Sequence, residues 1–354
     1  MSVREGVIVL VWAASTCFPT AQPQAATPLV EIRVSPDTTV DLAGAIVDDE
    51  GIAADNLTGT VTPLSIGAIP AQADLDGYAM RSNGEQLLSF DTTVVLPGGL
   101  TAQPGDVVRF NGASYAIEFD AAARGVPSGA NVDAVAIYGN LLLVSFDISV
   151  NLSGLQVDDE DLVTVGAVTF GMFFDGSAAG ISPDLDLDAA DYLDCADHLL
   201  LSFDGSGAIG GVAFDDEDVL EYDRATTWEV AYDGSAQHPS WVASDLDAVH
   251  AMVNLGPGPP VVFGQTVQAA ADKVVYQWPS PVAFKAVRGS FITPGNIGTY
   301  TVDGSVSGTG TSLSEPSTPA SGTGYWYLVK PGGCIQSSWQ STLGSEPGRD
   351  AAIP

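Results

Sequence analysis

The stretch that decides the fold runs from Asp186 to Ser235 and contains four motifs. In order they are Asp-Leu-Asp-Ala (186–189), Leu-Leu-Leu-Ser-Phe-Asp (199–204), Phe-Asp-Asp-Glu-Asp-Val (214–219) and Thr-Trp-Glu-Val-Ala-Tyr-Asp-Gly-Ser (227–235). Each motif recurs along the chain. The second aspartate of the first motif stands at positions 76, 133, 188 and 247, at intervals of 57, 55 and 59 residues. A fixed period of this length indicates a repeat architecture.

The other three motifs recur in the same order. Ser-Phe-Asp stands at 89–91, 145–147 and 202–204, with a weaker copy at 35–37. The acidic motif stands at 47–50, 157–161 and 214–218, with a degraded copy at 104–107. The fourth motif ends in Phe-Asp or Tyr-Asp at 119–120, 174–175 and 232–233. Four motifs kept in one order predict a single structural unit repeated along the chain.

Each unit is predicted to be a small antiparallel sheet. Segments such as 134–138, 141–146, 162–165 and 169–174 are rich in Val, Ile, Leu and aromatic residues, and Gly, Asn, Asp and Ser fill the gaps between them. This composition is typical of short strands joined by turns. Outside the N-terminus there is no helical periodicity over 12 or more residues. Four strands in about 57 residues is the size of one β-propeller blade.

The incomplete copies at the two ends predict how the repeats close. The first copy begins at about Leu29 without its opening strand, and the last, 245–253, consists of an opening strand alone. Together they make one complete unit, as expected when the last strand of a propeller completes the first sheet and leaves no open edge. The predicted blades are 29–73 with 245–253, 74–130, 131–185 and 186–244. An open stack or a sandwich is the alternative.

Charge divides the chain and excludes some partners. The net charge is −33, from 44 acidic and 11 basic residues. The last 90 residues hold five acids and five bases, so the first 264 hold 39 acids and 6 bases. This change marks a domain boundary near 255–265. An acidic surface repels nucleic acid, whose recognition needs clustered Lys and Arg, but it suits cation binding or solubility in a saline medium.

The N-terminus predicts export. Residues 1–26 contain one Arg, the apolar run Val7–Ala14 and then small and polar residues, which is the order of a secretory signal peptide. No other apolar run approaches the ~20 residues of a transmembrane helix. We therefore expect a secreted protein, free or associated with the bacterial surface.

The C-terminal part is predicted to be a separate β domain. A Pro-rich linker, 254–264, leads into 265–354, where 274–278, 283–288, 298–302 and 325–330 are expected strands separated by Gly, Ser, Thr and Pro segments, notably 304–324. This part also contains Asp272-Lys273, Trp278, Val287-Arg288-Gly289, 324–329, Cys334 and Gly348-Arg349. With these residues it resembles a fibronectin type III-like module found at the C-termini of secreted bacterial proteins. The resemblance implies a small β-sandwich.

Two further resemblances concern the repeats. The acidic repeat of about 57 residues resembles repeats in exported bacterial proteins of unknown activity. Four-bladed closure is similar in plan to hemopexin-type domains, which is an analogy of architecture and implies no function.

The carboxylates are the candidate metal ligands. The opening strand of a blade usually lines the central channel, so the repeat would bring Asp76, Asp133, Asp188 and Asp247 toward one axis. Four carboxylates there would repel unless a cation or hydrogen bonds relieved them, and Ca²⁺ takes six to eight oxygen ligands. The acidic motifs add Asp158, Asp161, Asp215 and Asp218, although their spacing differs from that of an EF-hand. The alternatives are carboxylates that accept backbone N–H bonds, and solvated turns.

Other residue types give weaker indications. Trp228 and Trp241 are candidate ligand-binding residues if exposed on one face, and core residues otherwise. Cys195 and Cys334 are candidates for one disulfide bond, with two free thiols as the alternative. The Asp-Gly-Ser triplets are expected at tight turns, and the three histidines show no metal-ligand spacing.

The sequence thus favours an all-β protein: a four-bladed propeller closed by residues 245–253, followed by a small β-sandwich. The expected function is a non-enzymatic, calcium-stabilised binding or structural module at the bacterial surface or in an extracellular assembly, with other proteins or polysaccharide as partners. Two alternatives remain. One is a secreted hydrolase that acts on polysaccharide with paired carboxylates. The other is a self-assembling filament or surface-layer subunit.

Overall fold

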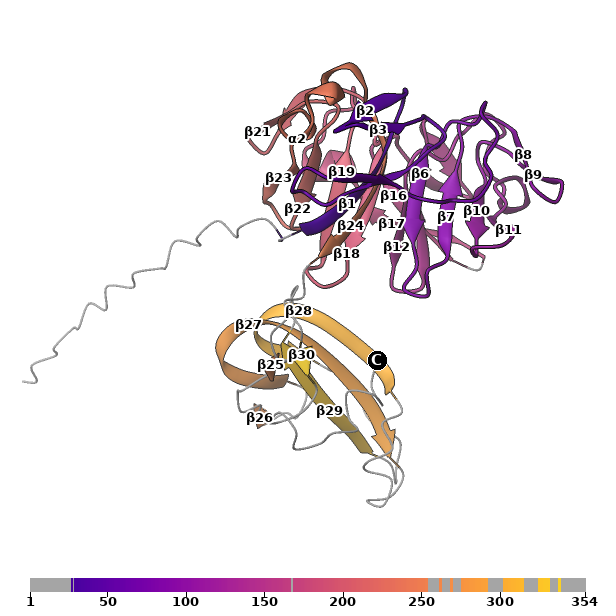
Figure 1. Ribbon diagram of the computed structural model, residues 1–354. Helices are drawn as coiled ribbons and strands as arrows, with labels where there is room; N and C mark the ends of the chain where they lie inside the picture. Colours follow the sequence, from indigo (N-terminus) through magenta and orange to yellow (C-terminus); the bar gives the residue numbers. More distant parts are fainter. Residues whose placement is uncertain are drawn as a thin grey trace, which may run out of the picture.

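The computed structural model describes residue 27, residues 29–166 and 168–253, and six strand segments beyond residue 260. Residues 29–253 form four four-stranded antiparallel sheets around a common axis, which is the architecture of a four-bladed β-propeller (Figure 1). The strands of each sheet lie within one of the four repeats, with β24 joining the first. The same part also contains four short hairpins and four short helical segments: η1 (Ala122–Arg124), α1 (Gly176–Ala179), α2 (Gly234–Gln237) and η2 (Pro239–Ala243).

Each blade runs from an inner strand at the axis to an outer strand. The first blade is β24 (Leu246–Val253), β1 (Leu29–Pro36), β4 (Ala53–Asp55) and β5 (Val61–Pro63); the second is β6 (Gly77–Met80), β7 (Gln86–Ser89), β10 (Val107–Phe110) and β11 (Tyr115–Phe119). The third is β12 (Val135–Tyr138), β13 (Leu141–Val144), β16 (Leu162–Val165) and β17 (Phe170–Phe174); the fourth is β18 (Ala189–Leu193), β19 (His198–Ser202), β22 (Val219–Tyr222) and β23 (Trp228–Tyr232).

A second small hairpin within each repeat was not predicted. It lies between the second and third strands of every blade, so each repeat holds six short strands. The four hairpins are β2 (Val40–Leu42) with β3 (Ala45–Val47), β8 (Val94–Leu96) with β9 (Leu100–Ala102), β14 (Val150–Leu152) with β15 (Leu155–Val157), and β20 (Gly207–Ile209) with β21 (Val212–Phe214). Positive φ at Gly44, Gly154 and Gly211 lets three of the turns close tightly. The acidic motifs are the turns that follow these hairpins.

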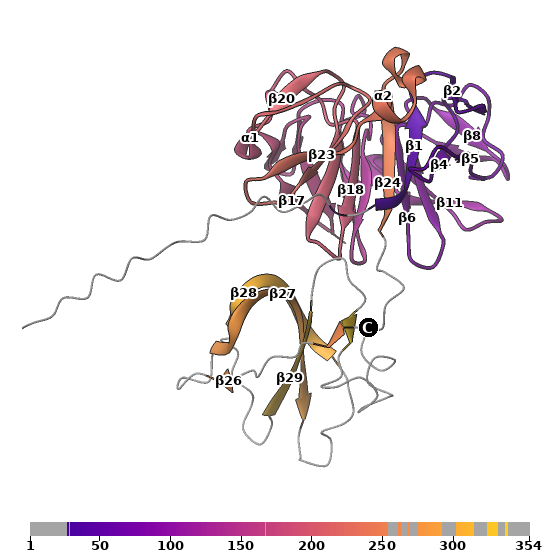
Figure 2. The ribbon, with the colours of Figure 1, turned by 60° about the vertical axis from the view of Figure 1, so that its left-hand side comes forward.

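The closing strand is confirmed. β24 pairs antiparallel with β1, with Val34 opposite Val249 and Ile32 opposite Ala251, as Figures 1 and 2 show. The C-terminal strand of the propeller therefore completes the sheet that the N-terminal strand begins. Because the inner edge of the first blade is paired in this way, the ring leaves no unpaired strand at the axis.

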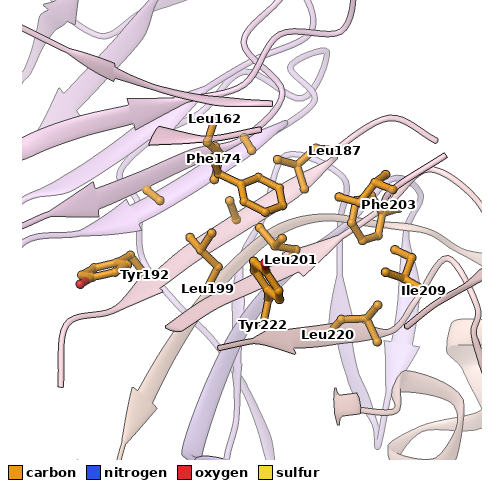
Figure 3. Packing of buried hydrophobic residues seen from close by; sticks show 14 of the residues in the cluster. Leu162, Phe174, Leu187, Tyr192, Leu199, Leu201, Phe203, Ile209, Leu220 and Tyr222 are labelled. Carbon is orange, nitrogen blue, oxygen red and sulfur yellow. The ribbon is translucent and has the colours of Figure 1, made fainter. Parts of the chain in front are cut away.

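The core lies between neighbouring blades. In Figure 3, Leu162 and Phe174 of the third blade pack toward Leu199, Leu201 and Tyr222 of the fourth. Equivalent clusters fill the other three seams. Both faces of the fourth sheet are covered near the axis, so β18 and β19, its first two strands, show no alternation and have every residue buried.

Trp228 and Trp241 belong to this core, which corrects their assignment as candidate ligand-binding residues. Trp228 stacks on Tyr222 with ring centroids 4.4 Å apart. Trp241 is fully buried, and its indole Nε1 donates to the Tyr232 hydroxyl at 3.1 Å. Neither ring is available to stack on a sugar, because each is covered by the seam that it helps to fill.

Beyond residue 260 the described residues are strands. β27 (Val275–Phe291) pairs with β26 (Gln268–Ala269), β28 (Val302–Ser314) and β29 (Gly324–Pro331), and β25 (Val261–Val262) pairs in parallel with β30 (Ser337–Ser338). Two expected strands, 274–278 and 283–288, are one long bulged strand, and residues 304–314 lie in β28 although a separating segment was expected there. The Val and Thr residues of β28 explain why it is a strand, because the strand preference of these β-branched residues exceeds the cost of the glycines between them. The fibronectin-like resemblance and the linker remain predictions.

Cys195 follows β18 and forms a disulfide bond. The chain has three cysteines, and both others, Cys17 and Cys334, lie outside the described residues, as does the expected signal peptide. We expect the bridge to join Cys195 to Cys334. Peptide mass mapping of the unreduced exported protein should show the linked pair, and a Cys334→Ser variant should leave Cys195 open to alkylation.

Candidate functional site at the acidic ring

The four equivalent aspartates of the repeat lie at one end of the inner strands. Asp76 and Asp188 directly precede β6 and β18, Asp133 lies two residues before β12, and Asp247 is the second residue of β24. The four inner strands pack against one another around the axis. Because all four inner strands begin at the same end of the axis, each blade places one carboxyl group there. We call these four residues the acidic ring.

The ring members are close enough to perturb one another. Burial, opposed by a hydrogen bond from Asn131 and helped by the charges of Asp91 and Asp74, raises the pKa of Asp76 to about 8. Burial also raises the pKa of Asp133 to about 9, together with the charges of Asp186, Asp76 and others.

The same causes act on the other two members. Burial, with the charges of Asp74 and Asp76, raises the pKa of Asp247 to about 9. The pKa of Asp188 is raised well above its usual value by burial and by the charges of Asp245 and Asp133. A buried carboxyl surrounded by like charges takes a proton or a cation more readily than one in water. At neutral pH the ring therefore favours bound protons or cations.

A second tier of aspartates surrounds the ring. Asp74, Asp186 and Asp245 each stand two residues before a ring aspartate, and burial, followed by neighbouring charges, raises their pKa to about 7. The third blade has Asn131 at this position, and its side-chain amide donates to the Asp76 carboxylate. Two buried acceptors in this tier, Asp74 Oδ1 and Asn131 Oδ1, have no hydrogen-bond partner among the described residues.

The Ser-Phe-Asp motif holds the second tier in place. Asp37 Oδ1 accepts the backbone N–H of Asp245 at 2.8 Å, and Asp204 Oδ1 accepts that of Asp186 at 2.9 Å. In the third blade Asp147 Oδ1 accepts the N–H of Asn131 at 2.7 Å. These bonds join the second strand of a blade to the segment entering its inner strand. The motif was recognised as a repeat, and its role is to fix the carboxyl groups near the axis.

The acidic motifs form an outer set with a structural role. Asp161 accepts the N–H of Asp158 with one carboxylate oxygen and that of Gly176 with the other, both at 2.9 Å. Asp218 does the same with Asp215 at 3.0 Å and Gly234 at 3.1 Å. Because both oxygens of each carboxylate are already used, Asp161 and Asp218 hold turns in place rather than presenting free ligands.

The Asp-Gly-Ser triplets begin one-turn helices rather than tight turns. Asp175 and Asp233 are the N-cap residues of α1 and α2, and each side chain accepts the backbone N–H three residues on. An Asp at the N-cap satisfies a backbone donor that the helix leaves free. The triplets are thus caps, and no catalytic role is needed to explain them.

The histidines were not recognised as structural partners. Each of the three lies beside a buried carboxylate: His198 Nδ1 is 2.5 Å from Glu221, His238 Nε2 is 2.8 Å from Asp55, and His250 Nδ1 is 3.3 Å from Asp191. The sequence signal was slight, because the partners lie in other strands and follow no repeat. None of the three faces the acidic ring, because His198 and His250 lie toward the opposite end of their strands.

The ring does not form a ready metal cage. Within the part of the chain that the structure describes, no group of three or more His, Cys, Asp or Glu side chains is arranged to hold a metal ion. Direct coordination would require the ring carboxylates to move together, whereas a hydrated or organic cation could be held through water or by hydrogen bonds.

Comparison with known proteins finds only distant similarity. No family model matches the chain, and no curated protein matches it. Among solved structures, it is similar to a virginiamycin B lyase from Staphylococcus aureus, with 9% identity and a TM-score of 0.28 over 70% of this chain and 83% of that one. It is also similar to YCF48 from Cyanidioschyzon merolae, with 9% identity and a TM-score of 0.24, and the match spans 52% of each chain.

A third similar structure is a protein of unknown function from Bacteroides caccae, with 11% identity and a TM-score of 0.23 over 80% of this chain and 73% of that one. These low scores carry no argument about activity. No helix among the described residues is long and apolar enough to cross a membrane.

Proposed function

We propose that the propeller is a non-enzymatic extracellular binding or structural module whose acidic ring holds a cation, with Ca²⁺ as the first candidate. The supporting observation is the convergence of four half-buried carboxyl groups, one from each blade, on one end of the axis. Charges of one sign at such a place are tolerated only when they are protonated or paired. Extracellular Ca²⁺ is a suitable partner because it accepts many oxygen ligands in flexible geometry.

The second tier strengthens this proposal. Asp74 Oδ1 and Asn131 Oδ1 are buried acceptors without a donor among the described residues, and each such atom costs free energy unless water or a cation satisfies it. A hydrated Ca²⁺ at the ring would supply donors through its water molecules. The cation would tie the four blades together at the axis.

Calcium binding is tested by calorimetric titration. We expect the chelator-treated protein at pH 8 to bind Ca²⁺ with a Kd in the range of about 0.1–1 mM, as extracellular calcium modules do, and to unfold at a higher temperature once loaded. The double variant Asp133→Asn/Asp188→Asn should lose both effects. The control is Asp184→Asn, since Asp184 is an exposed carboxylate just before the second tier.

The outcome that would contradict the proposal is specific. Neither heat nor a thermal shift with about 10 mM Ca²⁺, together with a folded propeller, would rule out a calcium site. Equal binding by the natural chain and the double variant would place the cation elsewhere on the acidic surface.

A further inference from the structure

Glu221 is a buried carboxylate that accepts hydrogen bonds from Thr27, at the N-terminal end of the propeller. It lies in β22 of the fourth blade and is 1% exposed. One of its oxygens accepts the backbone N–H of Thr27 at 2.8 Å, and the other accepts the Thr27 hydroxyl. Thr27 stands two residues before β1, which belongs to the first blade. The contact therefore crosses the seam at which the ring closes.

The charge of Glu221 is only partly compensated. His198 Nδ1 lies 2.5 Å from its carboxylate. Burial would raise the pKa of Glu221, but the hydrogen bonds from His198 and Thr27 outweigh it and hold the pKa below its usual value. Two other acids share this face of the blade: Glu229, directly opposite in β23, and Asp191, which pairs with Leu200 in β19. No Lys or Arg side chain bonds to Glu221 among the described residues.

The expected signal peptide ends immediately before this contact. Residues 1–26 have the order of a secretory leader, and Ala26 supplies the small residue directly before a cut at Thr27, whereas Gln24 stands where the A-x-A pattern has a second small residue. Cleavage of the bond between Ala26 and Thr27 would turn the Thr27 amide into an α-ammonium group with three donors. That group would carry a full positive charge at a position where the backbone nitrogen already lies 2.8 Å from a buried carboxylate.

We propose that the Ala26–Thr27 bond is the processing site and that the new α-ammonium group of Thr27 forms a buried ion pair with Glu221. The pair joins the N-terminus to the fourth blade, next to the β24–β1 closure. Export and removal of the leader then complete the ring seam, so the mature chain is more stable than a chain extended at its N-terminus. A charged donor to a carboxylate binds about twice as strongly as a neutral one.

The test has two parts. Intact mass and N-terminal sequencing of the protein exported from a bacterial host should give a chain that begins at Thr27. Thermal unfolding should then compare a chain that begins at Thr27 with one that carries a Gly-Ser dipeptide before Thr27, each with Glu221 and with Glu221→Gln. The extension keeps a peptide N–H at Thr27 and moves the α-ammonium group two residues away from it. We expect it to lower Tm by about 2–4 °C when Glu221 is present and to have no effect in the Glu221→Gln background.

The pH dependence identifies the ion pair. A carboxylate partner raises the pKa of an α-amino group above its ordinary value of about 8. A raised pKa gives stability that is present below about pH 8 and is lost as the pH rises through the folded-state value. The Tm difference between the two chains should therefore be full at pH 7 and should vanish near pH 10. A mature N-terminus at another residue, or an extension effect of the same size in the Glu221→Gln background, would overturn the proposal.

Discussion

At pH 8 and without divalent cations, the Asp133→Asn/Asp188→Asn variant is expected to unfold at a higher temperature than the natural chain. Amides keep the size of the carboxyl groups and cannot ionise, so the folded variant does not have to hold protons that the unfolded aspartates release above about pH 4. Each such carboxyl group costs the natural chain on the order of 1–3 kcal/mol at pH 8. For a domain of this size, the gain corresponds to a rise in Tm of roughly 5 °C or more.

The sign follows from the raised pKa values. An unfolded aspartate titrates near 3.9, whereas burial, helped by neighbouring charges, raises the pKa of Asp76 to about 8 and that of Asp133 to about 9. Between these limits the folded state binds more protons than the unfolded state, so stability is full below about pH 4 and falls as the pH rises toward 9. The natural chain should therefore lose stability between pH 5 and pH 8, and the variant should lose less.

The control and the contrary outcome are clear. At pH 5 the variant and the natural chain should differ little, because pH 5 is only about one unit above the pKa of an unfolded aspartate, and Asp184→Asn should have no effect at either pH. Added Ca²⁺ should remove the difference at pH 8 by stabilising only the natural chain. A natural chain that is equally stable at pH 5 and pH 8 in the presence of chelator would show that the ring carries no electrostatic cost.

The repeat made the blades predictable, and it also located the ring. Asp76, Asp133, Asp188 and Asp247 occupy one position of the repeat, so symmetry alone brings them to the axis. The closing strand was predictable for a related reason: β24 is the missing opening strand of the first copy. In both cases the position follows from equivalence between copies, whatever the individual contacts are.

The seams between blades could not be predicted in the same way. Trp228 and Trp241 are found in one copy alone, so the repeat gives no information about which face they occupy. The His–carboxylate pairs join residues separated by 23 positions for His198 and Glu221 and by 183 for His238 and Asp55. Such pairs are set by how two sheets pack. The second hairpins were missed because three-residue strands are too short to show an alternating pattern.

The largest loss of stability is expected from Asp55→Ala. Asp55 ends β4 in the first blade and is completely buried. Its carboxylate lies 2.8 Å from His238 Nε2 and accepts the Tyr232 hydroxyl at 3.2 Å, and both partners come from the fourth blade. Burial, together with Asp55, raises the pKa of Tyr232, so the hydroxyl remains a donor. The same hydroxyl accepts the indole N–H of Trp241.

Removal of the carboxylate would leave two donors of the fourth blade unpaired in the core. The cost of breaking such a buried network from one side is about 3–5 kcal/mol, which corresponds to a fall in Tm of roughly 10 °C for a propeller of this size. Asp55→Asn should cost less, because its side-chain oxygen can still accept from Tyr232. Chemical unfolding of the three chains measures the difference.

Hydrogen exchange then shows where the damage lies. Asp55→Ala should expose the amides of β4 and β23 before those of β7 and β13, because the seam between the first and fourth blades is the place where the ring closes. The exposed Asp184→Ala variant provides the matched control, with an expected change within about 0.5 kcal/mol. If Asp55→Ala changes stability no more than this control, the closure must depend on the β24–β1 pairing and the apolar seam alone, and the polar network contributes nothing measurable to it.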